Sequence, residues 1–313
     1  MAAMVVNSLL TAHDKGEHSI SQSTPAMIVG GVKATVPLEL KSARHNELVH
    51  AVREGGPFDV VFVGDSIMQT LNDNDYGQKF TALQKTWDAY LEPRLTLNLS
   101  HDSHRIEHLL WNLENGELEF PVSPKVFVLL VGTNNCDDRW HRRSYATFAP
   151  VHNPQEVCDG THALIRTIRR RHPMSRVLLL RIFPRGGDED VAVSLPAFHS
   201  SLGCVELCRR AGQLTRRLAD NRYVFWLDVN GVFLRPDGRV DTSMLWDLLH
   251  PSPAGADAWV RAILPTLDRL IDEAEVEREI ASSFPWLERF VRATCEWCHC
   301  LLCSKIGCAR QRH

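Results

Sequence analysis

The chain has 313 residues, of which 44% are hydrophobic, and its formal net charge is -3. A chain of this length and apolar content can bury a full core, and the lack of excess basic charge argues against nucleic acid as a partner. No run of about 18 apolar residues occurs, so we expect no membrane-spanning helix.

Residues 1–38 mix Ser, Thr, Gly, His and Pro without a sustained hydrophobic period, and we interpret them as a flexible leader. The short apolar patch at residues 1–10 has no basic flank before it, which is atypical of a secretory signal. The chain contains nine cysteines, an odd number that argues against a disulfide framework. These features predict a cytoplasmic protein with reduced thiols.

From residue 39 onward, short apolar runs alternate with longer segments of helical pattern. This alternation is typical of an α/β fold in which helices cover both faces of a parallel sheet. In such sheets, functional sites form at the carboxyl ends of the strands. Strands are predicted at 59–63, 95–99, 126–131, 177–182 and 223–227, and helices at 105–114, 154–171, 195–220 and 253–280.

The first predicted strand ends in Gly64-Asp65-Ser66, where an apolar run stops at small, turn-forming residues. This position makes the Ser66 hydroxyl a candidate nucleophile. By itself the triplet is equally compatible with a serine that only caps the following helix. The two roles are not exclusive, because backbone N–H groups at such a turn are also able to stabilise an oxyanion.

Two further polar segments complete a candidate constellation. The third predicted strand ends in Gly132-Thr133-Asn134-Asn135, where the Asn134 amide is a candidate oxyanion donor and an ordinary turn is the alternative. Asp247 and His250 lie three residues apart, just before the last predicted helix. At this spacing the carboxylate is able to orient one imidazole nitrogen while the other faces a serine, whereas a solvated pair is the alternative.

Taken in this order, these motifs resemble the SGNH or GDSL-like hydrolases. The segments VFVGDS (61–66), LWNLENGEL (110–118), VGTNN (131–135) and FPRG (183–186) are more closely similar to the catalytic α subunits of intracellular platelet-activating factor acetylhydrolase. The similarity extends over about residues 44–271. We therefore expect a hydrolase domain at 39–280.

The resemblance implies a flavodoxin-like, three-layer αβα sandwich with a five-stranded parallel sheet. It also implies a dimer, a short-chain acyl ester as substrate, and neither a metal nor a cofactor. On the family pattern, His250 draws the proton from Ser66 and Asp247 stabilises the imidazolium. The N–H of Ser66, the amide of Asn134 and a glycine N–H after the second strand then hold the oxyanion.

The chain departs from the family at that glycine, because an ungapped match places Asp102 there and every glycine of the turn is replaced. An aspartate retains the backbone N–H but lacks the conformational freedom of glycine. A carboxylate about 4 Å from an oxyanion opposes it by about 4 kcal/mol at an effective dielectric constant near 20. We expect low turnover if Asp102 points inward, and retained turnover if it faces solvent or is neutralised by His101 or His104.

The sequence also contains two clusters of metal-ligating residue types. His101, His104 and His108 have a spacing that is compatible with a metal site, but a polar rim around the active-site mouth is the preferred interpretation. The predicted tail at 281–313 is compatible with a zinc knuckle, with palmitoylation that holds the enzyme at a membrane, or with incidental thiols. Its cysteines are Cys295, Cys298, Cys300, Cys303 and Cys308.

The sequence therefore predicts a serine esterase that hydrolyses short-chain acyl, and in particular acetyl, esters of a lipid or another small molecule. Two alternatives remain open at this point. One is a sugar O-acetylesterase that uses the same residues, and the other is a catalytically weak scaffold or binding protein that retains the fold and works through its Cys-rich tail.

Overall fold

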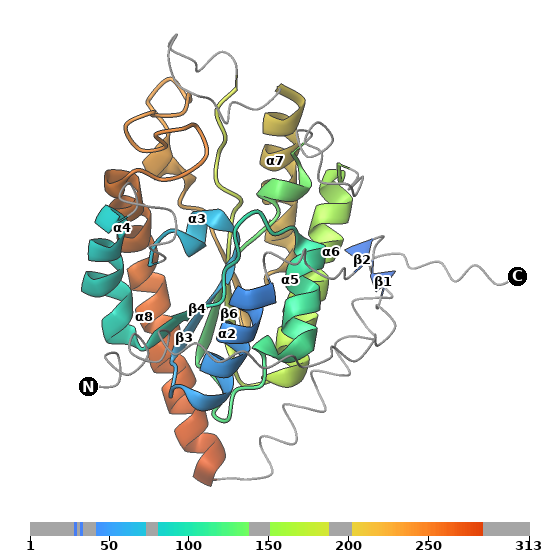
Figure 1. The fold of residues 1–313 in the computed structure, drawn as a ribbon, viewed down its shortest axis with the longest axis vertical. Coiled ribbons are helices and arrows are strands. Elements are labelled where there is room, and N and C mark those ends of the chain that lie inside the picture. The colour runs from blue at the N-terminus through green and yellow to red at the C-terminus, as the bar shows by residue number, and fades with distance from the viewer. Residues whose placement is uncertain are drawn as a thin grey trace, which may run out of the picture.

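Five short apolar segments form one parallel sheet in the computed structural model (Figure 1). The structure describes residues 42–72, 81–137, 151–187 and 202–283, together with two-residue strands at 28–29 and 32–33. The sheet strands are rich in Val, Leu and Phe, and three of them are buried along their whole length, as expected for strands covered on both faces. They are β3 (Val60–Gly64), β4 (Thr96–Asn98), β5 (Val126–Leu130), β6 (Arg176–Leu180) and β7 (Val224–Leu227).

The strand order across the sheet is β4-β3-β5-β6-β7, and every neighbouring pair is parallel. This is the flavodoxin-like order, in which the chain first extends the sheet on one side of β3 and then on the other. The switch in direction lies between β3 and β5. Ligand sites of open α/β sheets form at the carboxyl ends of such a pair.

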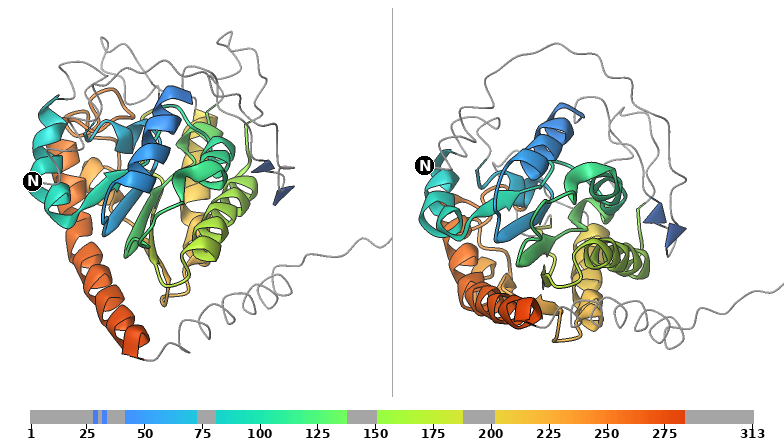
Figure 2. Two further views of the ribbon diagram at one scale, coloured as in Figure 1. Left: turned by 60° about the horizontal axis from the view of Figure 1, so that its bottom comes forward. Right: turned by 90° about the horizontal axis from the view of Figure 1, so that it is seen from below.

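Helices cover both faces of the sheet (Figure 2). One face packs against α2 (Ser42–Glu54), α5 (Ile106–Asn112), α6 (Pro154–Arg171) and α7 (Leu202–Leu214). The other face packs against α3 (Ser66–Gln69), α4 (Thr81–Thr86) and α8 (Pro253–Ser283). Alternate strand residues feed the two cores, so that Val61 and Val63 face the first layer while Val60 and Phe62 face the second.

Short irregular helices extend or link several of these elements. Two of them are π-helical turns that continue a preceding α-helix, and the others are 3₁₀ turns. They are η3 (Trp87–Leu91), η4 (Glu92–Arg94), η5 (Leu113–Glu117), η6 (Thr133–Asn135), η9 (Thr215–Leu218) and η10 (Asn230–Phe233).

The predicted α/β fold and the five parallel strands are confirmed, with strand ends within two residues of those expected. Residues 195–201 of the predicted helix at 195–220 lie outside the described residues, and its described part consists of α7 (Leu202–Leu214) and the 3₁₀ turn that ends at Leu218. Sequence reasoning did not anticipate α2 and α4. Leu48 and Val52 are the only hydrophobic residues of α2 that are buried in the core. Two such residues give only a weak helical period in the sequence.

Most of the predicted leader and tail lies outside the described residues. Within residues 1–38, the structure describes β1 (Ile28–Val29) and β2 (Val32–Lys33), which pair antiparallel beside α6. The first three residues of the predicted tail belong to α8, and its five cysteines are not among the described positions. Within the part of the chain that is described, no helix has the length and apolar character needed to cross a membrane.

Candidate active site

Ser66 is the first residue of α3 and directly follows the turn at the end of β3. The Asp65 side chain caps this short helix, because its Oδ1 accepts the N–H of Ile67 at 3.1 Å. The cap that the sequence offered as an alternative role for Ser66 is therefore supplied by its neighbour. The Ser66 hydroxyl is left to interact with another part of the chain.

That partner is His250, whose Nε2 lies 2.9 Å from Ser66 Oγ. On the other side of the ring, Nδ1 lies 2.7 Å from Oδ2 of Asp247. With Nδ1–H donating to the carboxylate, Nε2 is the acceptor for the serine hydroxyl. The structure thus brings together Ser66, which the sequence placed at a strand end, and the pair Asp247 and His250, which it placed in a turn before the last helix.

Asp247 is buried and held by the backbone of its own turn. Its Oδ1 accepts the N–H of Leu249 at 3.0 Å and that of His250 at 2.6 Å. Burial raises the pKa of Asp247, but the hydrogen bonds and charge of His250 outweigh burial and leave that pKa below its usual value. The carboxylate is therefore ionised at neutral pH, as is required to stabilise an imidazolium.

The turn that carries Asp247 and His250 packs closely against Gly186. Leu248 adopts a left-handed conformation with φ of 68°, and its carbonyl oxygen accepts the N–H of Gly186 at 2.9 Å. A Cβ on Gly186 would lie 2.6 Å from Leu248 Cδ2 and 2.8 Å from Leu248 Cβ. Glycine is favoured here because the Leu248 side chain occupies the space that a Cβ would need.

Asn134 lies in η6, the 3₁₀ turn that follows β5, and its side chain is buried. Its Nδ2 donates to the carbonyl oxygen of His104 at 2.9 Å. A primary amide carries two N–H groups, so this bond orients the side chain and uses one of them. The preceding Gly132 has φ of 111°, and a Cβ there would lie 2.9 Å from Val157.

Asp102 lies in the loop after β4, and the structure gives its backbone N–H a partner. The N–H donates to Oε1 of Gln69, a buried residue of α3. The Asp102 carboxylate accepts the hydroxyl of Ser103 at 2.9 Å. The expected third oxyanion donor is therefore already hydrogen-bonded within the protein.

The two histidines expected to neutralise Asp102 make other contacts. His101 Nε2 lies 2.8 Å from Oε1 of Glu117, and the same oxygen lies 2.8 Å from Nδ1 of His45 in α2. His104 Nδ1 lies 3.1 Å from the backbone oxygen of Asp102. These imidazoles brace the loop that follows β4.

Residues 62–258 match the model of the GDSL-like lipase/acylhydrolase family, which is well over half of the chain. The chain belongs to this family. The bovine (Bos taurus) platelet-activating factor acetylhydrolase IB subunit alpha1 is 28% identical over 257 residues, covering 82% of this chain and 92% of that protein. The rat (Rattus norvegicus) subunit alpha2 is 26% identical over 261 residues, with coverages of 83% and 98%.

Solved structures show the same fold. A Streptococcus pneumonia protein described as a platelet activating factor aligns with a TM-score of 0.55 at 20% identity, over 72% of this chain and 92% of that one. A GDSL-like lipase from Bacteroides thetaiotaomicron aligns with a TM-score of 0.54 at 12% identity, with coverages of 72% and 97%. Family membership makes this GDSL-like protein a carboxylic-ester hydrolase.

The turn that carries Asn134 is anchored by a buried polar network that sequence reasoning did not find. Asn135 accepts the N–H of Ile106 at 3.0 Å and donates to Oε2 of Glu107 at 2.8 Å. The other oxygen of Glu107 accepts Nε–H of Arg105 at 2.5 Å. This network joins the start of α5 to the end of β5 and fixes the position of the Asn134 turn.

Gln69 is a second site residue that sequence reasoning missed. Its position three residues after Ser66 was the available signal, because residues at this spacing lie on the same side of a helical turn.

The metal interpretation of His101, His104 and His108 gains no support: no group of three His, Cys, Asp or Glu side chains within the described ranges is arranged to hold a metal ion.

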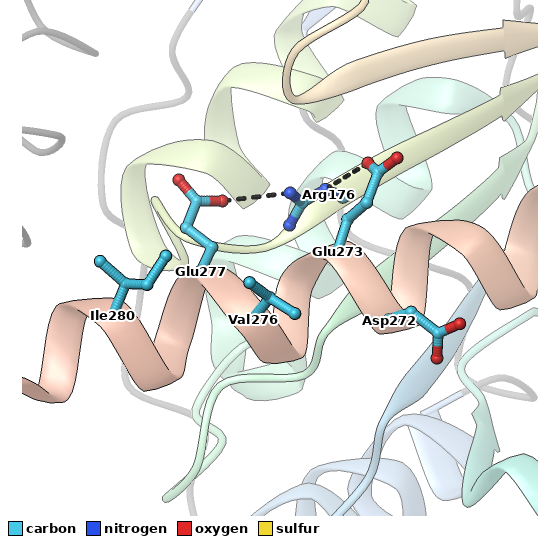
Figure 3. A pocket seen from close by; sticks show the side chains of 6 residues that line it. All are labelled: Arg176, Asp272, Glu273, Val276, Glu277 and Ile280. Carbon is cyan, nitrogen blue, oxygen red and sulfur yellow. Dashed lines mark ion pairs between the residues drawn. The ribbon is translucent and has the colours of Figure 1, made fainter.

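A shallow groove of about 440 Å³ lies elsewhere, along the second half of α8 (Figure 3). Arg176, the first residue of β6, forms ion pairs there with Glu273 at 3.5 Å and Glu277 at 3.2 Å. Ser66 follows the carboxyl end of β3, so this groove is at the opposite edge of the sheet. It contains none of the residues of the candidate active site.

Proposed function

We propose that this enzyme hydrolyses short-chain acyl esters, in particular acetyl esters of a lipid or another small molecule, by a Ser-His-Asp mechanism. The observation that carries the proposal is the continuous hydrogen-bonded chain from Ser66 through His250 to the buried Asp247. The relatives are named as acetylhydrolases of platelet-activating factor, which supports an acetyl ester as the substrate class.

In the proposed first step, His250 Nε2 takes the hydroxyl proton as Ser66 Oγ bonds to the ester carbonyl carbon. The resulting imidazolium is stabilised by Asp247, whose carboxylate lies 2.7 Å from Nδ1. The proton then passes to the leaving alkoxide as its bond to carbon breaks, which leaves an acyl group on Ser66. Water, activated by the same histidine, releases the acid and restores the serine.

The developing oxyanion needs hydrogen-bond donors in fixed positions. We assign this role to the backbone N–H of Ser66, the Asn134 amide and the backbone N–H of Asp102. The bond from Asn134 to His104 supports the assignment, because it holds the amide in one orientation. The Ser103 hydroxyl, as a donor to the Asp102 carboxylate, offsets part of the repulsion expected from that charge.

The test replaces Ser66 by alanine and measures hydrolysis of p-nitrophenyl acetate, longer p-nitrophenyl esters and acetylated sugars. We expect kcat/KM to fall by at least about 10³-fold, since removal of the nucleophile leaves only the remaining donors and binding. Ser282→Ala, which changes an exposed serine of α8, is the matched control. Normal turnover in Ser66→Ala would exclude the mechanism.

A fluorophosphonate probe separates this proposal from the scaffold alternative. The wild-type protein is expected to be labelled at Ser66, whereas a folded protein whose Ser66 does not react favours the scaffold.

A cytoplasmic location is part of the same proposal. It is supported by Cys136, Cys158, Cys204 and Cys208, which form no disulfide bonds, and cell fractionation tests it.

A further inference from the structure

We propose that Gln69 is a positioning residue that holds the Asp102 N–H while no substrate is bound and releases it to the oxyanion during the reaction. The inference rests on the proposed function, because it assigns Asp102 N–H to the oxyanion hole. It goes beyond that function by naming the side chain that controls when this donor is available.

The first observation is the contact itself. Oε1 of Gln69 accepts the N–H of Asp102, and the Gln69 side chain is only 5% exposed. A backbone N–H can only donate, so the carboxamide must present its oxygen and not its nitrogen. The Asp102 N–H, which is expected to serve the oxyanion, is therefore already bonded to the side chain of Gln69, three residues after the proposed nucleophile.

The second observation is that the backbone on both sides of this contact is fixed. The N–H of His101 donates to the carbonyl of Gly64 at 3.1 Å, and the His101 ring binds Glu117. On the other side, the carbonyl of His104 accepts the Asn134 amide. The Gln69 backbone is itself held, because its N–H donates to the carbonyl of Asp65 at 2.9 Å.

With both backbones fixed, the Gln69 side chain is the part of this contact that is able to move. Glutamine has several rotatable bonds and pays mainly conformational entropy to be held in one rotamer. Rotation of the carboxamide is enough to free the N–H without displacing the loop. An oxyanion is a stronger acceptor than a neutral amide oxygen, so the Asp102 N–H is expected to bond to the oxyanion in preference to Gln69.

The pre-existing bond reduces what the third donor contributes to the rate. An interaction accelerates the reaction only by the amount by which it is stronger in the transition state than in the free enzyme. A typical intramolecular hydrogen bond corresponds to a factor of about 2 to 10 in an equilibrium or rate constant. Removing the Gln69 acceptor is therefore expected to increase kcat by about 2- to 10-fold.

The test uses Gln69→Met and Gln69→Leu, which keep an apolar volume of similar size and lack the carbonyl oxygen. Gln69→Glu keeps an acceptor, adds a negative charge and is expected to lower kcat. Gln84→Met is the matched control, because Gln84 lies in α4 and its side chain contacts Asp88. Thermal unfolding identifies any variant that does not fold, and either apolar variant suffices for the test.

Two readouts are combined. Hydrogen–deuterium exchange of the Asp102 amide, followed by NMR, is expected to be faster in the apolar variants and unchanged in Gln84→Met. For a short-chain ester, kcat is expected to increase in the apolar variants while KM changes little. A merely structural role for Gln69 would instead lower kcat together with the unfolding temperature.

The outcomes distinguish the two proposals. Esterase activity that does not depend on Ser66 overturns the proposed function and this inference with it. Ser66-dependent activity that the apolar variants lower or leave unchanged overturns the inference alone. Unchanged exchange of the Asp102 amide in those variants also overturns the inference alone, because Gln69 would then not hold that N–H.

Discussion

At the residue scale, Asp65 combines a structural role with an unfavourable environment. Its carboxylate caps α3 through the N–H of Ile67, yet the side chain is only 1% exposed. Burial raises the pKa of Asp65 to about 7 from its ordinary 3.8, and the nearby charge of Asp102 adds to the increase. The folded protein therefore keeps this proton over a pH range in which the unfolded chain has released it.

The sign of the effect on stability follows from linkage. Asp65 contributes stability below about pH 4, and the contribution is lost as pH rises through about 7. Asp65→Asn retains the cap without a titratable group. Between pH 5 and 8, we expect the unfolding free energy of the variant to rise relative to wild type by about 2–4 kcal/mol.

Urea unfolding at the two pH values measures this difference. Asp220→Asn is a suitable control, because Asp220 caps the N–H groups of Arg222, Tyr223 and Val224 at a more exposed turn. We expect no comparable gain there. A stability difference between Asp65→Asn and wild type that is independent of pH would contradict the assignment.

At the element scale, the site depends on how the turn from Asp247 to His250 packs against the segment that follows β6. Arg185 in that segment is buried and donates to the carbonyl of Thr133 at 3.1 Å and to Asp137 at 2.7 Å. Its neighbour Gly186 contacts Leu248. One short segment thus holds both the Asn134 turn and the turn that carries His250.

Gly186→Ala tests this packing. The added Cβ displaces Leu248, which lies between Asp247 and His250 in the turn, so we expect a loss of about 1–3 kcal/mol in unfolding free energy. We also expect kcat to fall by about 10- to 100-fold, because displacements near 1 Å have effects of this size. Gly231→Ala is the control, since a Cβ there meets no atom within 4 Å. Equal activity of the two variants would show that the turn tolerates the displacement.

At the scale of the whole molecule, α8 runs from the edge of the sheet where the strands end to the edge where they begin (Figure 1). It begins at Pro253, just after His250, and its 31 residues extend for about 45 Å. Its second half contacts the segments that precede β5 and β7. Lys125, just before β5, forms an ion pair with Glu275, and Tyr223 Oη, just before β7, donates to Glu277 at 2.6 Å. Ser283, the last described residue of α8, therefore lies at the edge opposite the candidate active site.

This geometry predicts that removal of residues 284–313 leaves ester hydrolysis nearly unchanged. The tail is attached to α8 at the edge opposite the candidate active site, so we expect kcat and KM to stay within about twofold of the full chain. Replacement of all five tail cysteines by serine in the full chain is the companion variant. A loss of activity on truncation greater than about tenfold would instead assign the tail a part in catalysis.

Zinc binding and palmitoylation of the tail stay predictions, which metal analysis and fractionation test. The dimer also stays a prediction, which light scattering tests.

The α/β fold and the family were predictable because their signals are local. An apolar strand that ends in Gly-Asp-Ser carries its meaning within a few residues, and the same holds for the Asn134 turn and for the pair Asp247 and His250. Parallel strands then place such ends at one edge of the sheet. The division into 1–38, 39–280 and 281–313 stays a prediction, since most of the outer segments lies outside the described residues.

The amino-acid sequence by itself determined the sheet, its strand ends and the residue types gathered there, because burial and strand periodicity act over short stretches. Only the tertiary structure decided which polar groups pair. It gave the Asp102 N–H to Gln69, paired His101 with Glu117 and set Gly186 against Leu248. These contacts join segments that are distant in the sequence, and each depends on a backbone position and a side-chain rotamer that no local pattern specifies.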